Sequence, residues 1–343
     1  MRILILGSTL GGVHRRGIGS RPAGALLGLA KTHIIVNPAS AAGKTGKRLK
    51  NILKAIEERL KGSYSLYVTG RPREATQSAK TAIEQGANLV IAIGGDGTVQ
   101  EVVNGFPFEQ NGGENPCHLG IVCSGTAQDF AKSFGLPRLI EHQVDIVCGD
   151  HSRSVDVGRV SYIDLHGRRA ERFFINECQP GIAAVVVERV SKSAKRLGGF
   201  LGFGLAAVAT IARHRDQVMA VTIDDRETVT GPLLGVVVAN GSYAGGGMNF
   251  APRAKVDDGL FDVVLIHGQR VISRLVNFPK IYTGKHVDLS WVSYQEGKRV
   301  SVTSEEQVLL EADGELLGYL PCSIQLLPRA LQIKTSPGNS NSP

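Results

Sequence analysis

The chain has 343 residues, with 42 glycines, 14 prolines and a net charge of +8. Apolar residues make up 42% and charged residues 20%, which excludes a disordered, collagen-like or coiled-coil chain and allows two domains with sizeable cores. Residues 1–60 hold 11 Lys and Arg against 2 Asp and Glu, without one aromatic residue. Basic nucleic-acid binders usually place aromatic residues near their positive patch. We therefore expect no nucleic acid partner, and one anion-facing surface near the N-terminus.

Cysteine usage and hydropathy indicate where the protein works. The five cysteines are an odd number and include no CxxC pair, so a disulfide framework or a zinc site is not expected and a reducing cytosol is favoured. Of two uncharged stretches, Thr228–Pro252 is broken by glycines and a proline, and Leu197–Ala212 is too short to span a bilayer. We expect a cytoplasmic protein without a transmembrane segment, able to act peripherally at the inner face of the membrane.

The first half of the chain alternates short apolar runs with helical patterns. Uninterrupted apolar strands that alternate with helices are typical of a parallel, doubly wound sheet covered on both faces. Such sheets bind ligands at the carboxyl ends of their strands. The predicted strands are His33–Val36, Leu66–Val68, Leu89–Ile93 and Leu119–Val122, and the predicted helices are Lys47–Leu60, Arg73–Gln85, Thr98–Asn104 and Thr126–Phe134.

After about Val155 the pattern becomes a series of strands with few helices, typical of a mainly antiparallel β domain. The expected helices lie in Ala183–Ala212 and Gln269–Thr283. The predicted strands are Val155–Val160, Arg172–Ile175, Val218–Ile223, Leu233–Ala239, Leu260–Ile266, Arg299–Val302, Gln307–Leu310 and Ser323–Leu327. The predicted organisation is a basic, glycine-rich extension (1–31), a nucleotide-binding α/β domain (32–155) onto which a segment near 322–334 could pack, a β-rich lipid-substrate domain (156–321) and a disordered tail (335–343).

The strongest local feature is Gly94-Gly95-Asp96-Gly97-Thr98, which follows a predicted strand and opens a helix. Glycines let backbone N–H groups approach an anion, and the helix N-terminus adds its dipole. A carboxylate beside such a cradle suits metal-dependent phosphoryl transfer, although an ordinary tight turn would look the same. Ala42–Thr45 only imitates a Walker A loop, because position 38 is Pro. Lys44 could face phosphate or solvent.

The longer string Gly94–Gly105, GGDGTVQEVVNG, resembles the diacylglycerol kinase catalytic domain family, which includes bacterial lipid kinases and the sphingosine and ceramide kinases. GGDG alone would also fit NAD kinases and phosphofructokinases. Further resemblances follow in the family's order over roughly residues 33–334: Asn37–Ser40 with Gly43-Lys44, Gly125–Ala131, Val155–Arg159, Phe174–Asn176, Asn240-Gly241, Gly245–Gly247, Ala251-Pro252, Asp257–Leu260 and Asp313–Glu315. This chain departs at Gln128, usually Asn in the family, and at Cys123, usually Pro.

The resemblance implies an ATP- and Mg²⁺-dependent lipid kinase that phosphorylates a hydroxyl of diacylglycerol or of a sphingoid or ceramide-like lipid. It implies Glu315 as general base, with Asp96 as the other candidate for that role. It also implies a magnesium site at Asp258 with backbone carbonyls near Lys255 and Leu260. The residues implied to contact the nucleotide are Asn37, Ser40, Thr69, Gly94, Gly95, Gly97, Thr98, Gly125 and Thr126.

Several alternatives stay open at this stage. Without the resemblance, Asp313–Glu315 would be interpreted as a hairpin turn and Asp257–Gly259 as a simple turn. Leu197–Ala212, bracketed by basic residues, is either a lipid-entry helix at an anionic interface or a core helix. The competing functions are a NAD kinase-like enzyme with a soluble substrate and a catalytically silent nucleotide- or lipid-binding protein. A homodimer is compatible with all three.

Overall fold

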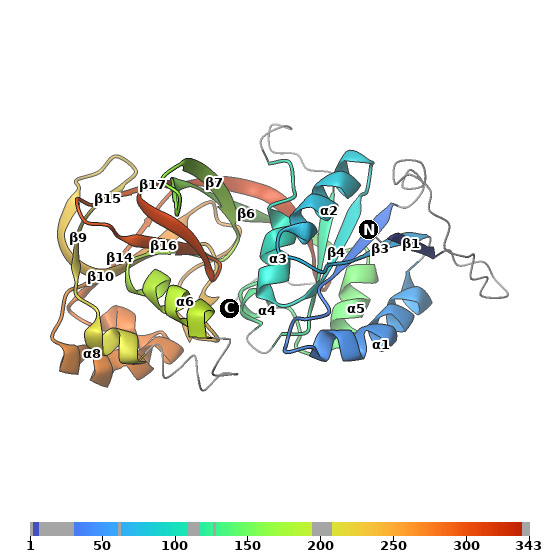
Figure 1. Ribbon diagram of the computed structural model, residues 1–343, viewed down its shortest axis with the longest axis horizontal. Coiled ribbons are helices and arrows are strands. Elements are labelled where there is room, and N and C mark those ends of the chain that lie inside the picture. The colour runs from blue at the N-terminus through green and yellow to red at the C-terminus, as the bar shows by residue number, and fades with distance from the viewer. Residues whose placement is uncertain are drawn as a thin grey trace. The chain divides into compact units, whose positions relative to one another are not determined.

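The computed structural model describes residues 3–6, 31–60, 63–108, 117–125, 128–193 and 208–337. The chain divides into two compact units (Figure 1). The first unit comprises Met1–Val155 together with Arg329–Pro343, and the second comprises Asp156–Pro328.

The first unit is built on a sheet whose strands lie in the order β1–β3–β2–β4–β5. β2, β3, β4 and β5 pair in parallel, and β1 joins the edge antiparallel to β3. On the far side of β5, Gln332 and Ile333 at the end of β17 add a parallel partner. The bounds are β1 Ile3–Leu6, β2 Thr32–Val36, β3 Tyr64–Val68, β4 Leu89–Gly94, β5 His118–Cys123 and β17 Glu315–Lys334.

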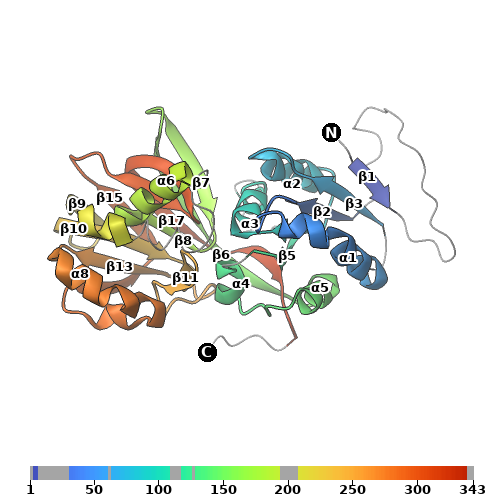
Figure 2. The same cartoon turned by 60° about the horizontal axis from the view of Figure 1, so that its bottom comes forward.

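Helices cover both faces of this sheet (Figure 2). The buried side chains of α1 (Lys44–Arg59) and α5 (Ile140–Cys148) form an apolar cluster with the central strands. α2 (Glu74–Glu84) and α3 (Asp96–Val103) cover the opposite face, and α4 (Asp129–Ser133) is a short turn after β5. Because apolar residues on both sides are buried, β2 and β4 contain no exposed residue.

The second unit is a β-rich body whose strands pair mainly antiparallel. Its main strand order is β17–β15–β9–β10–β13–β14, and β8 joins β10 to β16. The bounds are β6 Ser152–Asp164, β7 Arg169–Phe174, β8 Glu177–Pro180, β9 Gln217–Ile223, β10 Val229–Ala239, β11 Tyr243–Ala244, β12 Met248–Asn249, β13 Phe261–His267, β14 Val292–Gly297, β15 Arg299–Thr303 and β16 Leu309–Ala312.

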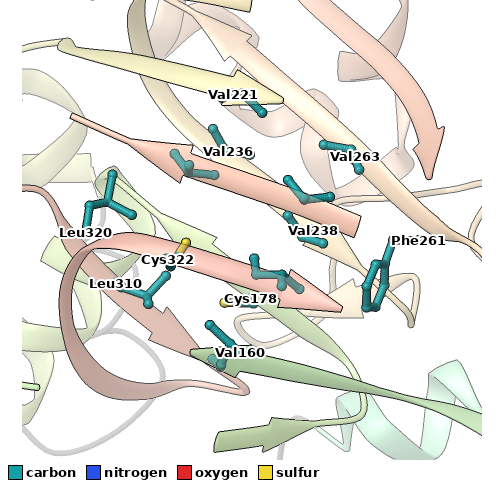
Figure 3. Close-up of a cluster of buried hydrophobic side chains, with 14 of the residues drawn as sticks. Val160, Cys178, Val221, Val236, Val238, Phe261, Val263, Leu310, Leu320 and Cys322 are labelled. Atoms are coloured by element: carbon teal, nitrogen blue, oxygen red, sulfur yellow. The ribbon is translucent and has the colours of Figure 1, made fainter. Parts of the chain in front are cut away.

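Alternation along β10 and β13 gives the second unit two apolar layers. Val236, Val238 and Val263 point into the core between the strands (Figure 3). Leu234 and Val264 belong to a second cluster on the other face. Helices accompany these strands: α6 Ile182–Ser193, a helix over residues 208–213, α8 Val271–Asn277, and the 3-10 helices η1 Phe278–Thr283 and η2 Lys285–Asp288.

Several expectations need correction or fall outside the described residues. Ile3–Leu6, expected within a flexible extension, forms strand β1 at the sheet edge. The expected helix Thr126–Phe134 is the shorter α4, and Thr335, expected in a disordered tail, is buried and donates its N–H to the carbonyl of His151 at 3.2 Å. Residues 7–30, 194–207 and 338–343 lie outside the described residues. None of the helices in the described ranges is long and apolar enough to cross a membrane.

Candidate active site

The glycine loop after β4 is too tightly packed for any side chain at its first position. A Cβ on Gly94 would lie 2.4 Å from the Oγ1 of Thr98. Gly95 precedes α3, which begins at Asp96 without a side-chain cap. The first N–H groups of a helix have no partner within the helix and favour an anion. This loop therefore places the N-terminus of α3 at the carboxyl end of β4.

The loops after β2 and β5 meet the glycine loop. Ser124 donates its N–H to the carbonyl of Gly94 at 2.8 Å, and a Cβ on Gly125 would approach the Cα of Gly95 to 3.3 Å. The hydroxyl of Thr45 lies 2.5 Å from both the Ser40 and the Ser124 hydroxyl. Three loops distant in sequence thus converge at one sheet edge, as the parallel topology requires.

Asn37 and Thr69, two further residues predicted to contact the nucleotide, lie at the same edge. Asn37 donates its N–H to the carbonyl of Ile93 at 3.0 Å and accepts the N–H of Ala39 at its side chain. Thr69 donates its N–H to the carbonyl of Val36 at 2.8 Å. Thr126 lies outside the described residues.

The carboxyl of Asp96 at this edge has a clearly raised pKa. Burial, and next the charge of Asp129, raise the pKa of its carboxyl to about 6. Its Oδ2 accepts the N–H of Asp129 at 3.3 Å, and Lys132 pairs with the Asp129 carboxylate at 3.1 Å. Among the described residues, Asp96 Oδ1 and Thr98 Oγ1 are buried without a hydrogen-bond partner. Such orphaned oxygens beside a second carboxylate suit a divalent cation with a phosphate.

The two departures from the family pattern are linked by hydrogen bonds. Cys123 donates its N–H to the side-chain oxygen of Gln143 at 2.8 Å, a bond that a proline could not make. Gln128 has a φ of 51° and donates its side-chain amide to the carbonyl of Cys123 at 3.1 Å. Both substitutions are therefore accommodated by local bonds just before α4.

In the second unit, Asp313 and Gly314 form the turn between β16 and β17. Both have positive φ, 49° and 78°, as a two-residue hairpin turn requires. The Asp313 carboxylate accepts the N–H groups of Ile175, Asn176 and Glu177 at 3.0, 3.0 and 3.1 Å. The interpretation of Asp313–Glu315 as a hairpin turn is therefore correct in its geometry. The Asp313 carboxylate also anchors this turn to the segment between β7 and β8.

Glu315 follows this turn with its side chain 40% exposed. Its Oε2 accepts a hydrogen bond from the guanidinium of Arg172 at 2.6 Å, and that guanidinium is the more buried partner. The ion pair holds the carboxylate in one orientation while leaving it accessible. Glu315 can therefore accept a proton from a hydroxyl that reaches it.

A buried asparagine ties together the other resembling segments of the second unit. The Asn240 side-chain amide donates to the carbonyls of Asp156 at 3.0 Å and Ile175 at 2.9 Å. The N–H groups of Asn240 and Gly241 both donate to the carbonyl of Asn176 at 2.8 Å. The Asn240 side chain thus satisfies two buried backbone carbonyls, a role that an apolar side chain could not fill.

The predicted magnesium residues lie together in the loop before β13. Asp258 accepts the N–H of Leu260 at 3.1 Å, and burial raises the pKa of its carboxyl. Burial raises the pKa of nearby Asp262 to about 6. Lys255 is exposed. Within the described ranges no group of three or more His, Cys, Asp or Glu side chains is arranged to hold a metal ion, so a cation here would depend on carbonyls and water.

The second unit encloses a cavity of about 310 Å³ on the side of its sheet that faces α6 and α8. Its wall is mostly apolar and includes Ile182, Val186, Leu234, Val237, Phe278 and Ile281. Because Gly314 also lines it, the cavity adjoins the turn that carries Glu315. Its mostly apolar lining is suited to a hydrocarbon chain.

Five buried polar side chains interrupt this apolar wall: Glu177, Gln179, Arg274, His286 and Glu311. Glu311 on β16 lies opposite Gln179 on β8. Glu177, two residues before Gln179 on β8, also lines the cavity. Glu311 is 2% exposed and accepts the Gly314 N–H at 2.9 Å. Burial, and to a lesser extent the charge of Asp313, raise the pKa of the Glu311 carboxyl to about 8.

Sequence reasoning left four of these groups without a role. Asp129 lies in a quoted segment, and its place one turn after the β5 loop could have indicated it. Arg172 is 143 positions from Glu315 and carries no local signal. Asp313 and Glu311 act through backbone contacts that only the folded strands bring together.

Two family models match successive parts of the chain. Residues 31–160 match the diacylglycerol kinase catalytic domain, and residues 177–335 match the YegS C-terminal NAD kinase beta sandwich-like domain. A crystal structure of a diacylglycerol kinase from Bacillus anthracis superposes with a TM-score of 0.66 at 22% identity, covering 90% of this chain and 98% of that one.

Curated relatives extend the match along the chain. A diacylglycerol kinase of Staphylococcus haemolyticus is 28% identical over 306 residues, covering 88% of this chain and 87% of that protein. A diacylglycerol kinase of Bacillus subtilis is 28% identical over 313 residues, covering 89% and 96%. With both domains matched and the family's motifs at one sheet edge and one hairpin turn, the chain belongs to the diacylglycerol kinase catalytic domain family and is a lipid kinase.

Proposed function

We propose that this lipid kinase transfers the γ-phosphate of ATP, with Mg²⁺, to the free hydroxyl of diacylglycerol at the inner surface of a membrane. The observation that carries the proposal is the apolar cavity beside the Asp313-Gly314 turn, because a phosphate acceptor with acyl chains needs apolar lining near the proton-accepting group. The relatives named diacylglycerol kinase support the choice of lipid.

The first unit would hold the nucleotide. The N–H groups at the start of α3 and the close approach around Gly94 and Gly125 suit phosphate oxygens. Asn37, Ser40 and Thr69 lie at the same edge, where the rest of the nucleotide would bind. Bound ATP with Mg²⁺ would supply an electrophilic phosphorus whose charge is partly neutralised.

Asp96 and Asp129 would hold the cation. The carboxyl of Asp96 has an unpartnered Oδ1 among the described residues and a pKa of about 6, so it is mostly ionised at neutral pH. A bound cation favours the ionised form further. A second, structural cation at Asp258 with carbonyls near Lys255 and Leu260 remains part of the proposal.

Glu315 would act as the general base. Glu315 directly follows Gly314, and Gly314 is part of the cavity wall. The guanidinium of Arg172 orients the Glu315 carboxylate. This carboxylate would take the proton from the lipid hydroxyl as that oxygen attacks phosphorus. Asp96 is better suited to the cation, because its buried oxygens lie against the phosphate-binding loop.

The test is a transfer assay with labelled ATP, Mg²⁺ and a panel of dispersed diacylglycerol, sphingosine, ceramide and, in solution, NAD. We expect labelled phosphatidic acid as the main product. Label on NAD with none on lipid would contradict the proposal, and label on sphingosine or ceramide alone would contradict the choice of lipid.

Variants test the assigned roles. Glu315→Gln should lower kcat by about 100- to 10,000-fold, the range for loss of a general base. Asp96→Asn should lower kcat and raise the Mg²⁺ concentration needed for half activity. Glu305→Gln, at an exposed position of the same unit, is the matched control and should leave both unchanged. Full activity in Glu315→Gln would refute the base assignment.

A further inference from the structure

The outer face of α8 exposes large apolar side chains that soluble surfaces usually bury. Ile272 is 77% exposed and Val276, one helical turn later, is 70% exposed. Tyr282 of η1 is 42% exposed and Val271 is 38% exposed. Single exposed apolar residues are common, but two β-branched residues at i and i+4 with an aromatic nearby form a patch.

The charge around this patch is mainly positive, with one exposed acidic residue, Asp288, at the end of η2. Residues 269–287 contain four Lys and Arg and no Asp or Glu. Arg274 is buried, pairs with Asp216 at 2.5 Å and donates to the carbonyls of Gln269 and His214. Arg270, Lys280 and Lys285 are exposed. An apolar face with a basic border matches an anionic lipid surface.

The inner side of the same segment forms part of the cavity wall. Asn277, Phe278, Ile281 and His286 line the cavity, while Ile272 and Val276 on the outer side are exposed. Figures 1 and 2 both place α8 and the 3-10 helices at the margin of the second unit. One short segment therefore separates the apolar cavity from a patch with the composition of an interfacial helix.

We propose that the outer face of residues 270–285 docks on the surface of a bilayer that contains anionic phospholipid. The exposed Ile272, Val276 and Tyr282 would enter the headgroup region, and Arg270, Lys280 and Lys285 would contact lipid phosphates. The inference rests on the proposed function only in that docking here would bring a membrane lipid next to the cavity.

The test is co-sedimentation of the full chain with vesicles, without ATP or diacylglycerol. We expect binding to phosphatidylcholine vesicles containing phosphatidylglycerol, and at least about tenfold weaker binding to phosphatidylcholine alone. The double variant Ile272→Ser/Val276→Ser should weaken binding about tenfold or more. Lys280→Gln/Lys285→Gln should weaken binding at low salt and reduce its salt dependence.

Two control variants match these changes. Leu165→Ser removes an apolar side chain that is 48% exposed in the turn between β6 and β7, and Lys298→Gln removes an exposed charge beside β15. Both should bind vesicles like the unaltered protein. Equal binding by the α8 variants and the controls would overturn the proposal.

Other occupants of the face would give different results. A lower melting temperature in Ile272→Ser/Val276→Ser would show that another part of the protein covers the face, and a changed mass by light scattering would show a second copy there. Either result overturns the proposal. Activity on a water-soluble, short-chain diacylglycerol separates the two proposals: it should survive in the α8 variants, and its absence in the unaltered protein would contradict the proposed function alone.

Discussion

Replacing Glu311 with glutamine should make the protein more stable at neutral pH. The carboxyl is buried in the cavity wall, where burial raises its pKa to about 8 from an ordinary 4.5. The folded protein keeps this proton up to about pH 8, whereas the unfolded chain releases it above about pH 4.5. The contribution of Glu311 to stability is therefore complete below pH 4.5 and is lost as pH rises through 8.

The size of the effect follows from the two pKa values. Between them, each pH unit lowers the free energy of unfolding by about 1.4 kcal/mol. Glutamine has nearly the same shape, cannot ionise and can still accept the Gly314 N–H at its side-chain oxygen. The advantage of Glu311→Gln over the unaltered protein should therefore grow by about 3 kcal/mol between about pH 5.5 and pH 7.5.

Urea unfolding of both proteins at four pH values measures this difference. Glu305→Gln, on an exposed carboxylate, should give a difference that stays flat with pH. Parallel stability curves for Glu311→Gln and the unaltered protein would refute the argument, because they would mean that Glu311 ionises normally inside the fold.

Three further predictions concern single contacts. Gly158→Ala should lower the free energy of unfolding, measured by urea denaturation, by about 2 kcal/mol or more, because its Cβ would lie 2.1 Å from the buried ring of Phe174. Gly231→Ala, whose Cβ would meet no atom within 4 Å, should change the free energy of unfolding by less than about 0.5 kcal/mol. Arg172→Leu should lower kcat about tenfold, because the Glu315 carboxylate would lose the ion pair that orients it. Arg172→Lys should recover part of the activity, and an unchanged kcat in Arg172→Leu would refute the orienting role. Asp313→Ala should lower the free energy of unfolding by about 3 kcal/mol, because three backbone donors lose a charged acceptor; a melting temperature equal to that of the unaltered protein would count against this.

The sheet-edge loops were predictable because their signals are local. Gly94–Thr98 follows an apolar strand and precedes a helix, so its position at a ligand-binding edge follows from the order of elements. The pairing of Arg172 with Glu315 has no such signal, since β7 and β17 meet only in the folded unit. The same applies to Glu311, whose burial depends on the opposing strand β8.

Some elements escaped prediction for identifiable physical reasons. β14 (Val292–Gly297) lies at the edge of its sheet, where polar residues are tolerated and the apolar alternation is weak. β17 extends from Glu315 to Lys334, although prolines at 321 and 328 suggest breaks. It pairs with β16 before Pro321 and with β15 after it, so neither ladder requires an N–H from that proline.

The return of β17 to the first unit affects how the chain can fold as it is synthesised. In sequence, Asp156–Pro328 is an insertion within the first unit, and the strand that completes the edge beside β5 contains Gln332 and Ile333. The sheet of the first unit can therefore be completed only after Ile333 has been synthesised. By then the inserted unit, which ends at Pro328, has already been translated in full. A gene fragment that stops after residue 160 would encode a sheet lacking its last strand, so this architecture resists loss or exchange of a domain by simple truncation.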